Sequence, residues 1–125
     1  MMQYIAVLIG GGIGAAARYG STQALNAVWA QSFPLGTFCV NALGSLVIGF
    51  LFQTFESHRL PGELRLFLIP GFLGGYTTFS SYALETLRLF SAGQVKQALF
   101  NLLLNNLAAL VLAGLGIGLS KALYL

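Results

Sequence analysis

The sequence predicts an all-α integral membrane protein with four transmembrane helices. Three observations predict this class: 57% of the 125 residues are hydrophobic, only 7% are charged, and the apolar residues form four long segments joined by short connections. Soluble domains carry about 25% charged residues, so this composition is typical of a chain that lies in lipid. We expect one membrane domain over residues 1–125, with spans at about residues 2–25, 34–55, 63–90 and 95–123.

The first span, residues 2–25, is rich in glycine. Gly10 and Gly14 form a G-x-x-x-G pattern, which allows another helix backbone to approach closely. The segment also matches G-x-G-x-x-A, a dinucleotide-binding pattern, but no strand precedes it and no acidic residue follows about twenty positions later. We therefore interpret the glycines as packing residues. Arg18, near the end of the span, either extends to the membrane interface or faces an ion vestibule.

The second span, residues 34–55, has a polar face. It starts at Pro34, which is tolerated in the first turn of a helix. Thr37, Asn41 and Ser45 then recur every four residues, so their side chains share one side of the helix. An amide at mid-membrane depth is costly unless it has partners. Asn41 therefore either bonds a neighbouring helix or lines a pore.

The third span, residues 63–90, contains helix-breaking and helix-capping residues, and its centre reads PGFLGGYTTFSSY from position 70 to position 82. Pro70 cannot donate to the helical ladder, glycines leave helical dihedrals at low cost, and threonine is a good N-cap. We predict a helix broken near the membrane centre, with halves at residues 63–73 and 78–90. Such a break offers free carbonyls to a cation and free N–H groups to an anion, whereas a packing kink is the alternative.

Beyond the break, Glu85 and Arg88 lie three residues apart, and we expect a structural ion pair near the interface. In the fourth span, residues 95–123, a neutral polar stripe includes Asn101 and Asn105. Further along this span, the sequence predicts a close-packing face formed by Gly114 and Gly118. The stripes hold amides and hydroxyls but no carboxylate. Neutral donors suit the dehydration of a small anion, but these groups also accept hydrogen bonds, so the sign of the ion stays open.

Several function classes are excluded by what the chain lacks. A net charge of +3 from six basic and three acidic residues gives no basic face for nucleic acid. Cys39 is the single cysteine, and His58 is the single histidine, in a connection between spans. No nucleophile–base set or metal-ligand cluster is present, so we expect no enzymatic activity.

The distribution of charge bears on orientation, because four spans put both termini on one side of the membrane. The six basic residues divide equally, with Arg59, Arg65 and Lys121 on the side of the termini and Arg18, Arg88 and Lys96 on the other. Equal numbers give the positive-inside rule no bias. We therefore predict insertion in both orientations and an antiparallel, dual-topology homodimer, because four short helices can hardly enclose a pore alone.

Three groups of residues resemble the bacterial fluoride channels, the Fluc or CrcB family: Gly11 to Tyr19, Gly36 and Thr37 with Asn41, and residues 71–80. The resemblance covers essentially the whole chain. It implies a channel in the inner (plasma) membrane that exports fluoride passively from the cytoplasm. It also implies a dual-topology dimer with two pores and a structural Na⁺ at its centre. By motif position, the backbone carbonyls of Gly74 and Thr77 would hold this ion.

The resemblance also implies pore residues. Asn41 matches the family's pore asparagine, Phe79 and Tyr82 match its two phenylalanines, and Ser81 with Ser80 matches its hydroxyl track. To these the polar pattern adds Arg18, Asn101 and Asn105. Aromatic ring edges carry partial positive charge, so we expect the edge of Tyr82 rather than its hydroxyl to hold the anion.

The chain departs from the family pattern at Tyr82, which replaces a phenylalanine, at Ala83, and at Ala109 and Ala113, where relatives commonly carry hydroxyls. Three other readings remain open. A small dual-topology multidrug or cation exporter would need a carboxylate in mid-span, yet no acidic residue precedes Glu56. The chain as one subunit of a heterodimeric fluoride channel is the second reading, and a purely structural membrane subunit is the third.

Overall fold

The computed structural model describes residues 1–124, which are helical apart from short connections. Three helices are continuous: α1 (Met2–Val28), α2 (Leu35–Ser57) and α6 (Val95–Leu123). The third hydrophobic segment consists of four consecutive elements: α3 (Gly62–Leu66), η1 (Phe67–Leu73), α4 (Gly74–Tyr76) and α5 (Phe79–Ser91). No strand occurs within the described residues, so the predicted all-α class is confirmed.

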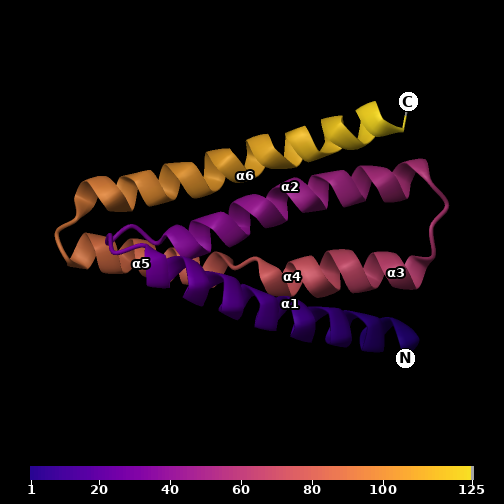
Figure 1. The fold of residues 1–125 in the computed structure, drawn as a ribbon, viewed down its shortest axis with the longest axis horizontal. Coiled ribbons are helices and arrows are strands. Elements are labelled where there is room, and N and C mark those ends of the chain that lie inside the picture. Colours follow the sequence, from indigo (N-terminus) through magenta and orange to yellow (C-terminus); the bar gives the residue numbers. More distant parts are fainter. Residues whose placement is uncertain (125) are drawn as a thin grey trace.

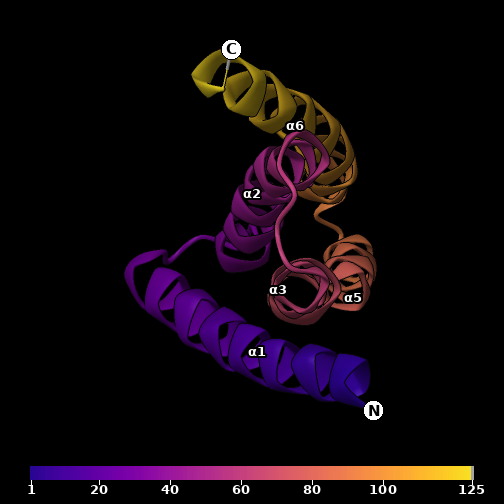
Figure 2. The same cartoon turned by 90° about the vertical axis from the view of Figure 1, so that its right-hand side faces the viewer.

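The helices form an elongated bundle in two pairs. α2 packs along α6, and α1 packs along η1 and α4 (Figure 1). Both ends of the chain lie at one end of the bundle, together with the α2–α3 connection. Viewed from that end, α1 and α6 lie on opposite sides, with α2 and the third segment between them (Figure 2). The third segment therefore contacts α1 on one side and reaches α2 and α6 on the other.

The outer surface of the bundle is strongly apolar. Leu8 on α1 and Leu110 on α6 are each 74% exposed, and many other large apolar side chains also face outwards. Among the described helices, α2 and α6 are each long and apolar enough to cross a membrane on their own. In lipid an apolar exterior costs nothing, and helices associate through close packing and hydrogen bonds instead. Such a surface is typical of a chain dissolved in a bilayer.

Glycines set the closest helix contacts, as predicted for Gly10 and Gly14. A Cβ on Gly10 would meet the carbonyl of Phe67, and one on Gly14 would meet the carbonyl of Phe72. α1 therefore rests directly on the backbone of η1.

The contact between α2 and α6 is closest at glycines, with Gly49 of α2 against the carbonyl of Ala113 and with Gly116 on α6. A Cβ on Gly116 would meet the carbonyl of Leu46, whereas nothing lies within 4 Å of the Cβ positions of Gly114 and Gly118. Gly114 and Gly118 therefore make no close contact within the single chain, because they lie on the face of α6 turned away from Gly116, and the close-packing face expected there stays a prediction.

The third segment departs from regular helix in two places. Pro70 lies inside η1, a π-helical stretch, where the wider turn accommodates a residue that has no N–H and whose ring would collide with the preceding turn. Helical backbone then continues from Gly74 to Tyr76, past the predicted end at Leu73. Thr77 (φ −88°, ψ 157°) and Thr78 (φ −149°, ψ 116°) have extended backbones, and α5 begins at Phe79.

Candidate functional site

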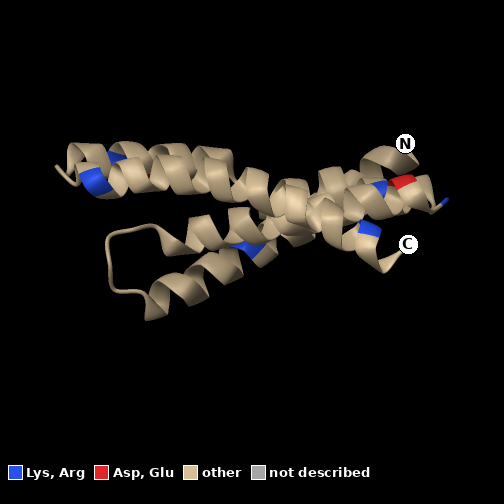
Figure 3. Cartoon of the chain, turned by 90° about the horizontal axis from the view of Figure 1, so that it is seen from above, with Lys and Arg blue, Asp and Glu red and all other residues tan. Residues whose placement is uncertain are grey.

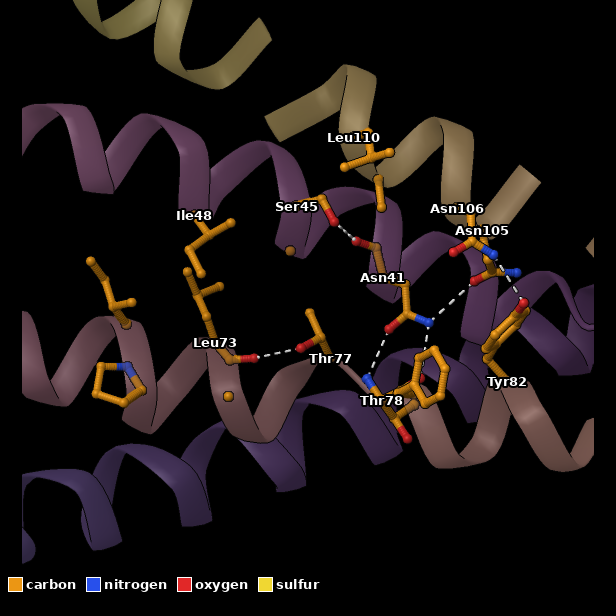
Figure 4. Close-up of a pocket in the computed structure, with 16 residues that line it drawn as sticks. Asn41, Ser45, Ile48, Leu73, Thr77, Thr78, Tyr82, Asn105, Asn106 and Leu110 are labelled. Carbon is orange, nitrogen blue, oxygen red and sulfur yellow. Dashed lines mark hydrogen bonds between the residues drawn. The ribbon is translucent and has the colours of Figure 1, made fainter. Parts of the chain in front are cut away.

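Asn41 of α2 binds the backbone where the third segment leaves helical geometry. Its Oδ1 accepts the Thr78 N–H at 2.8 Å, and its Nδ2 donates to the Thr78 carbonyl at 3.0 Å (Figure 4). Extended residues between two helices lose their ladder partners, and an unpaired buried backbone group is costly. One side-chain amide therefore satisfies both backbone groups of Thr78. The question left by the sequence is answered in part, because Asn41 bonds the neighbouring segment and also lines the cavity described below.

The side chain of Thr78 begins the next helix. Its Oγ1 accepts the backbone N–H of Ser81 at 3.2 Å, which is an N-cap bond, and lies 3.1 Å from the hydroxyl of Ser81. The hydroxyl of Ser80 lies 3.4 Å from the same oxygen. Three hydroxyls thus gather at the start of α5. Neither Ser80 nor Ser81 lines the cavity; Ser80 is exposed and Ser81 is half-buried.

Arg18 of α1 lies on the opposite side of the break. Its Nε donates to the carbonyl of Gly75 at 3.0 Å, and the residue is half-buried. Carbonyls at the end of a helical stretch carry partial negative charge, so a guanidinium there is favourable. The structure thus pairs Arg18 with the third segment rather than leaving it at the interface alone.

A chain of side-chain amides leads from Asn41 into α6. Nδ2 of Asn41 lies 3.2 Å from Oδ1 of Asn105, whose own Nδ2 donates to Oδ1 of Asn101 at 2.7 Å. Nδ2 of Asn101 then donates to the hydroxyl of Thr86 at 2.8 Å. Asn101 is 0% exposed and lies outside the cavity lining, whereas Asn105 is 7% exposed and lines it. The predicted polar stripe on α6 therefore serves largely to join α6 to α2 and α5.

An open cavity of about 530 Å³ lies beside the break (Figure 4). It is bounded by α2, by the third segment and by α6, and its polar lining comes from Asn41, Ser45, Thr77, Thr78, Tyr82, Asn105 and Asn106. None of the described residues that line it is charged. The cavity therefore combines neutral hydrogen-bonding groups with apolar walls, and it offers an ion dipoles rather than a counter-charge.

Phe79 and Tyr82 are neighbours at this cavity. Their ring centroids lie 5.3 Å apart with 58° between the ring planes. Phe79 is 76% exposed, whereas Tyr82 is only 5% exposed. The hydroxyl of Tyr82 accepts a hydrogen bond from Nδ2 of Asn106 at 3.0 Å. Sequence reasoning missed Asn106, although a tyrosine hydroxyl in an apolar span needs a polar partner, and that need was the available signal.

The residues expected to hold a cation also lie at this cavity. Gly74 and Thr77 both line it, and Gly74 is exposed. The extended backbone of Thr77 takes its carbonyl out of the helical ladder, and no described residue donates to that oxygen. The Thr77 hydroxyl instead donates to the Leu73 carbonyl at 2.9 Å. Carbonyl oxygens are suitable ligands for Na⁺, so these two residues fit such an ion.

The predicted ion pair between Glu85 and Arg88 is wrong. Oε1 of Glu85 accepts a hydrogen bond from the Thr37 hydroxyl at 2.8 Å, and Oε2 is buried without a described partner. The ion pair found among the described residues joins Arg65 to Glu56 at 3.2 Å. Glu85 turns towards α2 because a buried threonine there offers a donor across the helix interface.

Comparison with known proteins places these features in a family. Residues 5–117 match the family described as "CrcB-like protein, Camphor Resistance (CrcB)". A curated relative from Parabacteroides distasonis, named fluoride-specific ion channel FluC, is 40% identical over 121 residues, which cover 97% of this chain and 94% of the relative. Proteins with the same name from Coxiella burnetii (42% identical, covering 94% of each chain) and Legionella pneumophila (41% identical, covering 94% of this chain and 89% of the relative) are similar. The resemblance seen in the sequence is thus confirmed, and this chain belongs to the CrcB-like family.

Proposed function

We propose that this protein is a fluoride-specific ion channel that lets fluoride leave the cytoplasm passively. The observation that carries the proposal is the similarity to channels of that name along 94–97% of the chain. The cavity lining supports it, because it holds amides, hydroxyls and aromatic rings without a charged group. Such a lining replaces the water around a small anion with dipoles and ring edges, yet does not bind the anion so tightly that it stops moving.

For the pore we propose Asn41, Phe79, Tyr82 and Asn105, with Ser80, Ser81 and Arg18 along its approach. Asn101 has a supporting role, since its buried amide holds Asn105 at 2.7 Å. The exposed ring of Phe79 would meet the ion together with groups of a second subunit. The exporter alternative lacks support in the cavity, because Glu85, the acidic residue of α5, does not line it.

The second subunit is part of the proposal. Four spans in the inner membrane, an open cavity and an exposed Phe79 favour an antiparallel homodimer in which two copies close the pores. Basic residues lie at both ends of the bundle (Figure 3), as insertion in both orientations requires. A C-terminal tag is then accessible from both sides of the membrane in comparable amounts. A tag found on one side only, in a functional protein, favours the heterodimer instead.

We further propose a structural Na⁺ at the dimer centre, held by the carbonyls of Gly74 and Thr77 from both copies. A bound Na⁺ would supply positive charge where the ends of two helical stretches meet. This chain's contribution is the extended backbone of Thr77, which is kept in place by the hydroxyl bond to Leu73 and by Asn41 on the adjacent Thr78.

The decisive experiment measures anion efflux from liposomes that contain the purified protein. We expect rapid fluoride efflux and retention of chloride. Ser45 allows a matched test, because it lines the cavity. Its hydroxyl donates a hydrogen bond to the backbone carbonyl of Asn41 at 2.7 Å. A carboxylate in Ser45→Asp repels an anion, whereas Ser45→Asn adds a similar volume without charge, so only the aspartate variant should lose fluoride efflux. Equal chloride and fluoride efflux, or no fluoride efflux through folded protein, would contradict the proposal.

A further inference from the structure

The hydroxyl of Tyr82 is held in one orientation by Asn106. Nδ2 of Asn106 donates to this hydroxyl at 3.0 Å (Figure 4). It also donates to the Leu102 carbonyl at 2.7 Å, so both amide hydrogens have acceptors. The phenol oxygen therefore acts as an acceptor towards α6. Its own hydrogen must point elsewhere, because the direction facing Asn106 is already taken by the amide N–H.

No residue within positions 1–124 accepts the hydrogen of the Tyr82 hydroxyl, although its bond from Asn106 is formed. Tyr82 is 5% exposed and lines the cavity beside Phe79 and Asn41. A buried donor without an acceptor is costly, which makes an acceptor inside the cavity favourable. A hydroxyl that already accepts one hydrogen bond is also a stronger donor, because hydrogen bonds in a chain polarise one another.

We propose that the Tyr82 hydroxyl donates a hydrogen bond to the permeating fluoride and that Asn106 is the positioning residue that orients and polarises it. This inference rests on the proposed channel function and departs from the ring-edge role expected from the sequence. Fluoride is the smallest and hardest halide and the strongest hydrogen-bond acceptor among them. A directed hydroxyl thus favours fluoride over chloride more than a ring edge alone does.

A double-mutant cycle tests the pair with fluoride efflux from liposomes. Tyr82→Phe keeps the ring and removes the donor, and we expect efflux at least about ten-fold slower, as the loss of one hydrogen bond to an ion implies. Asn106→Leu is expected to slow efflux as well. In the Tyr82→Phe background Asn106→Leu should have no further effect, because its partner is gone. Tyr76→Phe is the matched control. It also removes a tyrosine hydroxyl, which donates to the Ser21 hydroxyl at 3.3 Å, but Tyr76 does not line the cavity.

Two outcomes of the efflux cycle overturn the inference. If Tyr82→Phe conducts fluoride at the wild-type rate, the hydroxyl of Tyr82 is not needed for permeation. If the effects of Tyr82→Phe and Asn106→Leu on efflux are additive, Asn106 does not act through Tyr82. Calorimetric titration of the solubilised protein with sodium fluoride gives a second readout that does not need conduction, and here Tyr82→Phe should bind fluoride at least about ten-fold more weakly. Absence of efflux through wild-type protein counts against the channel proposal alone, whereas equal fluoride binding by wild type and Tyr82→Phe counts against the hydroxyl donor.

Discussion

The two halves of the third segment are held by different kinds of contact. The half before Thr77 packs on α1 by backbone-to-backbone approach, because Cβ atoms on Gly10, Gly14 and Gly75 would all meet main-chain atoms. The half after Thr78 is held by side-chain hydrogen bonds to other helices, such as that from Thr37 to Glu85 at 2.8 Å. Any larger side chain at these glycines should therefore destabilise the first half, whether the new side chain is polar or apolar. Substitutions in the second half should have effects graded by the hydrogen bonds that they remove.

The contrast also separates the two proposed sites. The carbonyls proposed for Na⁺ lie where the glycine-packed half ends, so their positions depend on close packing. The aromatic and hydroxyl groups proposed for fluoride lie on the hydrogen-bonded half, where we expect a side chain to be exchanged without moving the backbone. Tyr82 with Asn106 illustrates this, because a hydroxyl added to the ring has a partner on α6.

The largest expected effect comes from filling the contact between α1 and η1. Replacing Gly10 and Gly14 together by alanine drives two methyl groups into the backbone at Phe67 and Phe72. Overpacking costs about 1–3 kcal/mol for each site, and a rigid backbone cannot yield as a side chain does. We expect little folded protein on size-exclusion chromatography and a lower melting temperature for what remains. Gly12→Ala is the matched control, because nothing lies within 4 Å of its Cβ position, and equal loss in that variant would contradict close packing as the cause.

The next effect concerns Asn41, which joins the halves. Asn41→Leu leaves the Thr78 N–H and carbonyl without their partner from α2, and each buried unpaired group costs about 1–3 kcal/mol. We expect a clearly lower melting temperature and loss of fluoride efflux. Gln53→Leu on the same helix removes an amide that bonds Ser57 at an exposed position and should change little. If both variants melt at the same temperature, the Asn41 amide does not stabilise the break.

These contacts mark what the sequence could and could not predict. The all-helical class follows from composition, and the irregular region follows from Pro70, the glycines and the threonines. The break itself is shorter than predicted, because helical backbone continues to Tyr76 and only Thr77 and Thr78 are extended. The π-helical stretch η1, which accommodates Pro70 in a wider turn, lies before the break and was not predicted.

Partners far apart in the sequence were beyond prediction. Asn41 and Thr78 are separated by 37 positions. A polar stripe on one helix does not predict which backbone segment its side chains will bond. The expected pair of Glu85 and Arg88 failed for the same reason. Spacing on one helix shows which groups can meet, but a donor on another helix decides which bond forms. Asn101 was expected in the pore and is instead fully buried, because Thr86 offers its amide an acceptor at 2.8 Å.

A smaller effect is expected at the contact between Thr37 and Glu85. Thr37→Val removes the hydroxyl that bonds Oε1, and Oε2 already has no described partner. The loss should be about 1–3 kcal/mol in the free energy of unfolding. Adding Glu85→Gln replaces a carboxylate by a neutral amide that costs less to bury, so the double variant should regain part of the loss. If the double variant has a lower melting temperature than Thr37→Val, the unpaired Glu85 carboxylate is not the cause of the loss.

The smallest effect is expected at Thr77, on the boundary between the halves. Thr77→Val keeps the branched shape and removes the hydroxyl bond to the Leu73 carbonyl, which still accepts the Thr77 N–H at 3.0 Å. We expect a loss of about 0.5–1.5 kcal/mol in the free energy of unfolding. Because the proposed Na⁺ ligand at this position is the carbonyl, the variant should keep its higher melting temperature in Na⁺ than in N-methyl-D-glucamine.

Gly44 allows the backbone of Thr77 to be moved without changing its carbonyl. A Cβ on Gly44 would meet Cγ2 of Thr77, so Gly44→Ala should push Thr77 away from α2 and weaken the dependence of the melting temperature on Na⁺. Thr77→Ser removes that methyl and keeps the hydroxyl, so Gly44→Ala with Thr77→Ser should restore the Na⁺ dependence. If Thr77→Val abolishes this dependence while Gly44→Ala preserves it, the hydroxyl of Thr77 rather than its carbonyl carries the cation site. The boundary would then belong with the half that is held by side-chain chemistry.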